Sequence, residues 1–600
     1  MKWQRWARGL VLSMMALGMA CTAPTVTIKI IALNDFHGNL ESPGPFNGRS
    51  SGGIDVLASY VAELKRRNPH HLVVSAGDLI GATPLLSASF HDEPTIETMN
   101  RLGLEFNALG NHEFDKGQEE LRRMQKGGCH PTDPNTCKGA LVGLPVPFEG
   151  AKFKFLAANV IEAATQKPIF PPYVIKQFNG VRLAVIGMTL KDTPTIVIPS
   201  GVAGLQFTDE AATVNALIPS LRARGVKGII VLLHQGGAQL TPPNPPDING
   251  CVGGLDNPDG TPSPIKQIVS HLDNAVDLVI SGHTHQAYVC RLPTASGREI
   301  LVTSANAQGR VLTDIELTLD TGTGKVLTAV ARNLVVDRTS GPGLSPNLTI
   351  QAIVNAYGNL VKPIANQVIG AITQEVSTLK DAACEMPAGE LIADAHLQAT
   401  RPPTLGGAQL ALMNPGGVRR PGFVYALPSD NKRPGEITYS EAFTVQPFGN
   451  SLVTLTLTAW QLKALLEQQF AGCLGKTVNR ILLPSAGFQF AWDLTQPPCE
   501  RIRQIMLRTG NDLDILVQDG TVLNPHRTYR ITVNSFLATG GDGFTVLNDG
   551  TERLGGAQDI DALIAYFAAF KPPAPAYNPI ASTRDKPRIR RLDASTSSCP

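Results

Sequence analysis

Five short apolar segments in the first half of the chain each end on side chains that are good ligands for metal ions. Aliphatic and β-branched runs of this length are typical of buried strands, and open α/β sheets collect their ligands beyond the carboxyl ends of the strands. We therefore expect the five strand ends to converge on one site. The runs, with the polar residues that follow them, are 28–33 with Asp35 and His37, 72–75 with Asp78, 106–109 with Asn111 and His112, 229–233 with His234, and 278–280 with His283 and His285.

The chemistry of these side chains favours hard or borderline divalent cations. Carboxylate, imidazole and amide groups without cysteine suit Zn, Mn, Co or Mg better than a soft metal or an iron–sulfur cluster. There are too many ligands for one tetrahedral ion, and Asp78 can bridge two ions about 3.5–4 Å apart. One ion can be held by Asp35, His37, Asp78 and His285, and the second by Asp78, Asn111, His234 and His283. Such a pair can clamp an oxyanion and activate a water molecule.

In their order along the chain, these motifs resemble the five sequence blocks of the calcineurin-like metallophosphatases. They are Asn-Asp-Phe-His-Gly at 34–38, Ala-Gly-Asp at 76–78, Gly-Asn-His-Glu-Phe-Asp at 110–115, His234, and Gly-His-Thr-His at 282–285. The third block is similar to that of the 5′-nucleotidase branch. The resemblance implies an α/β fold with a four-layer αββα sandwich that carries two divalent metal ions.

The resemblance also implies that His112 faces the phosphoryl group instead of binding metal, and that Asp115 orients the His112 ring. A histidine beside a metal ligand can reach the substrate, and a carboxylate three residues later can fix its tautomer. The alternative for Asp115 is an ordinary carboxylate at a helix N-terminus, because residues 116–124 have an amphipathic helical pattern.

Three segments of the second half are similar to the nucleotide-binding motifs of the 5′-nucleotidase C-terminal domain, which implies a second, α+β domain that binds the substrate. The segments are 414–419, 447–450 and 536–543, and their candidate binding residues are Asn414, Arg419, Phe448, Asn450, Phe536 and Asp542. Two phenyl rings, Phe448 and Phe536, can sandwich a flat base. Asp542 can accept from ribose hydroxyls, Asn450 can bond the base edge, and Arg419 can pair with phosphate.

One segment departs from the family pattern. Many family members place an arginine before a Gly-Asn-Leu helix, whereas this chain has Ala382, Ala383 and Cys384 at those positions and Glu390 in place of the asparagine. Losing an arginine from a phosphate pocket removes a charge-assisted contact worth about 1.5–3 kcal/mol. Lys380 can compensate only as a point charge, so the identity of the phosphoester is less firmly predicted than its hydrolysis.

The N-terminus resembles a secretion signal. Residues 1–20 have a basic start followed by an apolar run that is too short for a membrane span. The sequence 17–21 resembles a bacterial lipoprotein cleavage site with Cys21 as the lipid-carrying residue, although Gly18 stands where a larger aliphatic residue is usual. Ordinary cleavage after Ala20 or Ala23 is the alternative. We therefore expect an exported protein, periplasmic or lipid-anchored in the cell envelope, with membrane contact only through Cys21.

The cysteine count agrees with export to an oxidising compartment. The chain has nine cysteines, and assigning Cys21 to a lipid leaves an even number for disulfides. We predict four pairs, although sequence alone does not fix the connectivity. They are Cys129 with Cys137, Cys251 with Cys290, Cys473 with Cys499, and Cys384 with Cys599.

The length of 600 residues is sufficient for two large domains, and turn-forming residues cluster at 337–346. We predict a signal peptide at 1–20, a metallophosphatase domain at 21–338, a linker with a bridging helix from Leu348 to about Asn366 at 339–366, and a substrate-binding domain at 367–600. The net charge of +2 provides no basic field for polymeric nucleic acid. The oligomeric state is not predicted.

These observations lead to one main functional hypothesis and three alternatives. We expect a dinuclear-metal phosphoesterase that hydrolyses extracellular 5′-nucleotides to nucleoside and phosphate. A 2′,3′-cyclic-nucleotide phosphodiesterase and a UDP-sugar hydrolase use the same chemistry on the same scaffold. The alternative from another class is a nucleotide-binding surface lipoprotein that does not catalyse a reaction, against which the complete ligand set argues.

Overall fold

The structure is a computed structural model that describes residues 24–197, 201–240, 247–257, 261–425, 432–476, 479–579, 587–593 and 599. The predicted signal segment 1–20 and the predicted lipid attachment at Cys21 lie outside these residues. In the part of the chain that the structure describes, none of the helices combines the length and apolar character needed to cross a bilayer.

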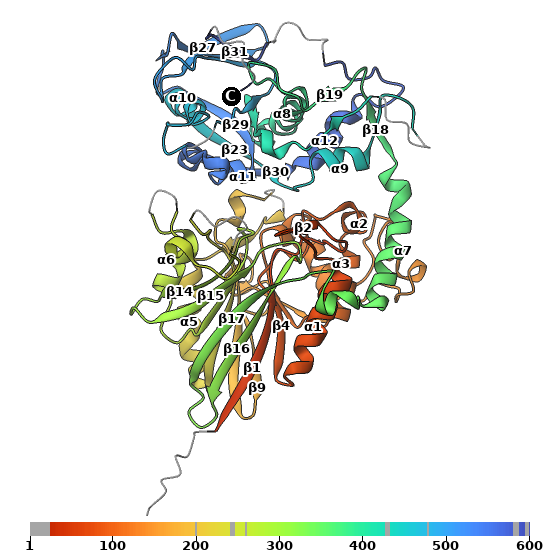
Figure 1. Ribbon diagram of the computed structural model, residues 1–600, viewed down its shortest axis with the longest axis vertical. Coiled ribbons are helices and arrows are strands. Elements are labelled where there is room, and N and C mark those ends of the chain that lie inside the picture. The colour runs from red at the N-terminus through yellow and green to blue at the C-terminus, as the bar shows by residue number, and fades with distance from the viewer. Residues whose placement is uncertain are drawn as a thin grey trace, which may run out of the picture.

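Two six-stranded sheets form the centre of the amino-terminal domain (Figure 1). The first sheet has the strand order β17-β16-β1-β4-β5-β6 and the second has the order β14-β15-β13-β12-β10-β9. In the first sheet β1, β4, β5 and β6 run parallel, and the antiparallel strands β16 and β17 close one edge. In the second sheet β15, β13, β12 and β10 run parallel, and the antiparallel strands β14 and β9 close the two edges. In the first sheet the strands are β1 (Thr25–Leu33), β4 (His71–Ser75), β5 (Phe106–Ala108), β6 (Lys154–Leu156), β16 (Val311–Asp320) and β17 (Val326–Val335); in the second they are β9 (Tyr173–Phe178), β10 (Val181–Thr189), β12 (Val226–His234), β13 (Leu278–Ser281), β14 (Ala287–Pro293) and β15 (Glu299–Ala305).

The position of strand β1 in the sheet accounts for its nearly continuous apolar sequence. Alternate residues of a strand point to opposite faces. Ile28 and Ile30 pack into the core between the two sheets, whereas Ile31 and Leu33 pack into the core beneath the outer helices. Both faces are therefore buried, as expected for a parallel strand that is covered on both sides.

Helices cover the outer face of each sheet and complete the predicted four-layer αββα sandwich. Helices α1 (Ile54–Arg67), α3 (Glu93–Leu102) and α4 (Gly117–Lys126) pack on the first sheet, and α5 (Glu210–Ala223) and α6 (Pro264–His271) pack on the second. The fold class predicted from the sequence is thus confirmed for this domain.

The carboxy-terminal domain is built on two five-stranded sheets with one shared apolar core. One sheet has the order β24-β20-β29-β23-β30 and the other has the order β28-β27-β26-β25-β31. Helices α8 (Pro387–Thr400), α9 (Tyr439–Val445), α10 (Ala459–Glu467) and α12 (Asp559–Ala568) pack around them, which gives the predicted α+β domain. The strands are β20 (Leu410–Met413), β23 (Ser451–Thr458), β24 (Leu483–Pro484), β25 (Phe488–Trp492), β26 (Ile502–Thr509), β27 (Asp512–Gln518), β28 (Thr521–Val522), β29 (Thr528–Asn534), β30 (Thr551–Gln558) and β31 (Ile589–Arg591).

Helix α7 (Leu348–Ala365) links the two domains and rises along one edge of the molecule in Figure 1. It matches the helix expected from Leu348 to about Asn366. The Asn347 side chain caps it by accepting from the Ile350 N–H. Ile350, Val354 and Tyr357 are buried in the core of the amino-terminal domain, so the first half of α7 belongs structurally to that domain.

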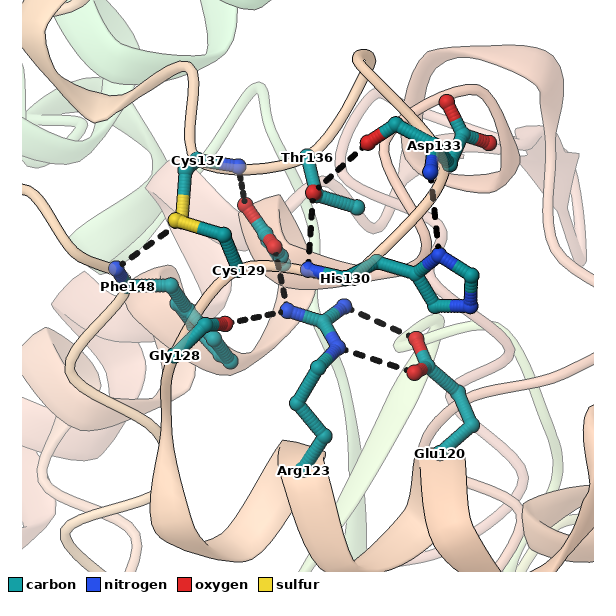
Figure 2. Close-up of a disulfide and its surroundings, with 10 residues drawn as sticks. Glu120, Arg123, Gly128, Cys129, His130, Asp133, Thr136, Cys137 and Phe148 are labelled. Atoms are coloured by element: carbon teal, nitrogen blue, oxygen red, sulfur yellow. Dashed lines mark hydrogen bonds and ion pairs between the residues drawn. A yellow bond between two sulfur atoms is a disulfide. The ribbon is translucent and has the colours of Figure 1, made fainter.

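All four predicted disulfides are present: Cys129–Cys137, Cys251–Cys290, Cys384–Cys599 and Cys473–Cys499. Figure 2 shows the first of them, which closes the loop after α4. Arg123 supports this loop, because its guanidinium donates to the Glu120 carboxylate at 2.8 Å and to the Gly128 carbonyl at 2.7 Å.

A buried carboxyl group should make the attachment of α7 pH-dependent. Tyr357 donates to Glu97 at 2.8 Å, and burial raises the pKa of Glu97 from 4.5 to about 7. The folded protein therefore holds this proton more tightly than the unfolded chain, and stability falls as pH rises through that interval. The penalty at pH 8 is on the order of 3 kcal/mol.

We predict that Glu97→Gln is more stable than the wild type at pH 8 and matches it near pH 4.5. The measurement is urea unfolding across this pH range. The control is Glu119→Gln, because the Glu119 side chain is 89% exposed. A Glu97→Gln effect that does not change with pH would contradict the assignment.

Candidate metal centre and substrate cleft

The five predicted strand ends do converge, and the backbone there is strained. Strands β1, β4, β5, β12 and β13 run parallel to a neighbour within their sheet and end at the same side of the sandwich. Several residues directly after them have positive φ values, an uncommon conformation for residues other than glycine. They are Asp35 (49°), His37 (46°), Asp78 (50°), His283 (72°) and His285 (55°). Strain of this kind persists where the surrounding structure fixes it, and it clusters at functional sites.

The predicted ligands form two clusters. In the first, ligand atoms of Asp35, His37 and His285 lie within 4.8 Å of one another, and in the second the same holds for Asp78, His234 and His283. Asp78 links them, because its Oδ2 atom is 3.0 Å from His234 Nε2 and 3.6 Å from His37 Nε2. The seventh predicted ligand, Asn111, places its Oδ1 atom 3.2 Å from His234 Nε2.

The tautomers of two histidines fit a cation well. His37 Nδ1 lies 2.9 Å from the Gly81 carbonyl and His234 Nδ1 lies 2.8 Å from the Ala76 carbonyl, so each Nδ1 donates to the backbone. In the neutral rings the Nε2 lone pairs then point into the clusters, where His37 Nε2 is 3.1 Å from His285 Nε2. Burial lowers the pKa of His37, and burial together with the neighbouring His234 lowers the pKa of His283 to about 3, so these two rings are neutral. Burial also opposes protonation of His234, but the Asp78 carboxylate outweighs it and raises the pKa of His234 to about 9, so cation binding there would release a proton. Convergent lone pairs and carboxylates of this kind suit divalent cations.

His112 lies beside these clusters and is paired with Asp115. Its Nδ1 atom is 2.8 Å from Asp115 Oδ2, and its backbone N–H donates to Asp78 at 2.9 Å. Burial opposes protonation of this ring, but the Asp115 and Asp78 carboxylates outweigh it and raise the pKa of His112 to about 10. Asp115 precedes Lys116, the N-cap of α4, and its carboxylate contacts the imidazole. This geometry favours the orienting role over the helix-terminus alternative.

Two residues that organise the site were not among the predicted site residues. Glu113 accepts from the backbone N–H groups of Asp78, Leu79 and Gly110 at 3.0, 2.8 and 2.6 Å. Asn34 donates to Asp35 at 2.6 Å. Both lie in motifs already recognised in the sequence, at 34–38 and 110–115. The motifs alone did not show that these two residues support the ligands through hydrogen bonds.

A third group with metal-binding side chains lies next to the disulfide in Figure 2. It consists of His91, Glu120 and His130, of which Figure 2 labels Glu120 and His130. The Glu120 carboxylate is already neutralised by Arg123, and His130 Nδ1 accepts the Asp133 N–H at 3.1 Å. His91 bridges the Glu120 and Asp133 carboxylates at 2.9 and 2.7 Å. We therefore interpret this group as a structural clamp.

In the carboxy-terminal domain, the two predicted base-stacking rings are exposed, Phe448 by 41% and Phe536 by 45%. The Arg419 guanidinium lies 4.4 Å from the centre of the Phe448 ring. Asp542 accepts from Asn414 at 2.8 Å, and Asn450 donates to the Asp559 carboxylate at 3.3 Å.

The segment that lacks the expected arginine is tied into the fold. Cys384 forms a disulfide with Cys599, and the Ala383 carbonyl accepts from Trp492 at 3.3 Å. Two basic side chains that were not predicted as site residues lie against Asp542. Arg480 is 3.4 Å from its carboxylate, and the Lys476 ammonium contacts its backbone carbonyl.

The two sites meet where the domains touch. A Cβ atom added to Gly449 would lie only 2.6 Å from Ala82 Cβ, and Gly449 has a φ of +61°. Ala82 follows Gly81, whose carbonyl accepts from His37 at 2.9 Å. The loop with Phe448 therefore packs directly against the loop that supports the two ligand clusters.

We predict that Glu113→Gln weakens metal binding by about 10- to 100-fold, the usual effect of losing a partner that orients ligands. The amide nitrogen of glutamine would face backbone N–H groups that now donate to a carboxylate. Competition titration with a chelating dye measures the change. Glu119→Gln is the control on the neighbouring helix, and an unchanged affinity would contradict the organising role of Glu113.

Comparisons with known proteins agree with this architecture. The family model described as calcineurin-like phosphoesterase matches residues 28–287, and the model described as 5′-nucleotidase, C-terminal domain matches residues 368–549. The solved structure of a 5′-nucleotidase precursor from Thermus thermophilus is 25% identical, with a TM-score of 0.55 over 95% of this chain and 100% of that chain.

Three curated relatives extend over most of this chain. Endonuclease YhcR of Bacillus subtilis is 29% identical over 96% of this chain and 42% of its own length. Cell wall protein Lmo0130 of Listeria monocytogenes is 29% identical over 87% of this chain and 64% of its own length. A probable 5′-nucleotidase of Treponema pallidum is 25% identical over 91% of this chain and 92% of its own length. The chain thus spans less than two thirds of the first two relatives. It belongs to the metallophosphoesterase family that joins a calcineurin-like phosphoesterase domain to a 5′-nucleotidase C-terminal domain.

Proposed function

We propose that this protein is a metal-dependent phosphoesterase that hydrolyses 5′-nucleotides to nucleoside and phosphate. The observation that carries the proposal is the pair of ligand clusters joined by Asp78, with His112 beside them and the exposed Phe448 loop packed against the same site. The Treponema and Thermus proteins, which match this chain over nearly their whole length, are named as 5′-nucleotidases and support this choice.

The proposed metal ligands are those predicted from the sequence. Asp35, His37, Asp78 and His285 would hold one divalent cation, and Asp78, Asn111, His234 and His283 would hold the other. When bound, two such cations neutralise phosphoryl oxygens and lower the pKa of water at the site.

His112 would assist through its other nitrogen. Because Nδ1 is directed at Asp115, the protonated ring can donate from Nε2 to charge that develops on a phosphoryl oxygen or on the departing sugar oxygen. Asp115 stabilises the charged ring and fixes its orientation. The glutamate and asparagine beside the ligands, Glu113 and Asn34, keep the loops in place.

The second domain would supply substrate recognition. Phe448 and Phe536 would stack on the base, which tolerates different bases. Asn450 would contact the base edge, while Asp542, held by Asn414, would accept from ribose hydroxyls. Arg419, which lies over Phe448, would bring a positive charge to the phosphate.

The missing arginine bears on which phosphoester the protein hydrolyses. With Cys384 committed to a disulfide, Lys476 and Arg480 are the cations that lie near Asp542. Lys476 offers only a point charge, and the Arg480 guanidinium already lies against the Asp542 carboxylate, so 2′,3′-cyclic nucleotides and UDP-sugars are the substrates to compare with 5′-nucleotides.

We also propose that the protein works outside the cytoplasm. The four disulfides suit an oxidising compartment, and the Listeria relative is named as a cell wall protein. Export by residues 1–20 and a lipid on Cys21 complete this proposal.

The test is phosphate release from AMP, a 2′,3′-cyclic nucleotide and UDP-glucose with Mn, Zn or Co present. We expect His112→Ala to lower kcat by about 10²- to 10⁴-fold, which is typical for loss of an acid–base group. Phe448→Ala should raise KM for AMP by about 10-fold or more, because stacking contributes about 1–3 kcal/mol per base.

Trp460→Ala is the matched control, because Trp460 is an exposed aromatic residue of α10, with 62% of its surface accessible. If the protein binds nucleosides but releases no phosphate with Mn, Zn and Co alike, the proposed hydrolase activity is contradicted and a binding protein is favoured.

A further inference from the structure

A hydrogen bond crosses from the carboxy-terminal domain to the His112–Asp115 pair. Gln558 Nε2 donates to Asp115 Oδ2 at 2.7 Å, and the same oxygen atom is 2.8 Å from His112 Nδ1. One carboxylate oxygen therefore accepts two N–H groups from opposite sides of the domain boundary. The Gln558 amide and the His112 ring therefore both constrain the orientation of the Asp115 carboxylate.

Gln558 is held rigidly in its own domain. It is the last residue of β30 and the N-cap residue of α12, so its backbone is fixed by a strand and a helix at once. It also pairs with Ser451 of β23 in the antiparallel register. A side chain anchored in this way has a defined position relative to the rest of the carboxy-terminal domain.

The same anchor joins Gln558 to the loop that carries Phe448. Asp559, the next residue, donates its backbone N–H to the Asn450 carbonyl at 2.7 Å and accepts from the Asn450 side chain at 3.3 Å. The base-stacking loop and Gln558 thus form one hydrogen-bonded unit. Movement of that loop relative to the amino-terminal domain would carry Gln558 with it.

The loop that carries Phe448 also contacts a loop next to Asp115. Gly449 packs on Ala82, as described above, and a Cβ atom added to the preceding Gly81 would lie 2.8 Å from Asp115 Oδ2. Asp115 is enclosed between the 81–82 loop of its own domain and Gln558 of the other. Its side chain is only 8% exposed, so water has little access to replace a lost partner.

We propose that Gln558 is a positioning residue that acts through Asp115 to orient His112. The arrangement of the catalytic pair is then complete only when the two domains adopt the geometry seen here. The carboxy-terminal domain would contribute to the chemical step as well as to substrate recognition. This inference rests on the proposed roles of His112 and Asp115.

The test is a double-mutant cycle of Gln558→Ala and Asp115→Asn in the full-length metal-loaded protein, with AMP as substrate. We expect Gln558→Ala to lower kcat about tenfold with less than a twofold change in KM. In the Asp115→Asn background it should cause no further loss, because residues that act through one partner are not additive. Gln558→Glu should lose more than Gln558→Ala, since it places a second carboxylate against Asp115.

Gln518→Ala is the matched control, because Gln518 is an exposed glutamine at the end of another strand, β27, of the same domain. Unchanged kcat in Gln558→Ala, a change confined to KM, or additive losses in the double mutant would each overturn the inference. If one of these results occurs while His112→Ala still lowers kcat by at least 10²-fold, only the role of Gln558 fails and the proposed function stands.

A measurement that needs no turnover decides the inference even if AMP is not a substrate. Nitrogen-15 spectra of the histidine side chains report the tautomer and hydrogen bonding of His112. Gln558→Ala should shift the His112 Nδ1 signal in the same direction as Asp115→Asn. An unchanged His112 signal in a folded Gln558→Ala protein would overturn the proposal.

Discussion

The whole site depends on one buried carboxylate, that of Asp78. Its side chain is only 2% exposed, yet it contacts both ligand clusters and receives the His112 N–H. Burial opposes its ionisation, but the histidines around it, led by His234, hold the pKa of Asp78 well below its usual range. A buried charge is stable only when it is paired or bonded. The loops from several strands are therefore arranged around this anion, and Glu113 fixes the backbone N–H groups next to it.

Much of this site was predictable because its signals are local in sequence. Each ligand follows directly after a buried strand, and parallel strands bring such positions together whatever the intervening loops contain. The helix α7 was also predicted, as the segment that follows the turn-rich residues 337–346. The four disulfides were predicted from the eight cysteines that remain once Cys21 is assigned to a lipid.

The remaining site residues could not be predicted because their roles depend on contacts between distant segments. Gln558 lies in a strand of ordinary sequence, and only its position opposite Asp115 gives it importance. Lys476 and Arg480 likewise belong to no recognisable motif, and they acquire a role where the chain brings them beside Asp542. The missing arginine and the Cys384–Cys599 bond were both predicted, whereas the basic side chains that lie beside Asp542 were not.

The domain arrangement connects recognition with chemistry. The loop with Phe448 packs on Ala82, and the neighbouring Gly81 supports His37 of the first ligand cluster. A base stacked on Phe448, as proposed, would therefore lie on a loop that packs against the loop supporting the ligand clusters. Nucleotide specificity and the rate of phosphoester cleavage should respond to the same interdomain contacts.

The most direct test of the account is elemental analysis of the purified full-length protein, with parallel analysis of Asp78→Asn. The account predicts two divalent ions per chain in the wild type, their loss on chelation together with a drop in thermal stability, and at most one ion in the variant. A wild-type protein that binds no more than one ion, with a melting temperature and hydrolysis that chelators leave unchanged, would contradict it.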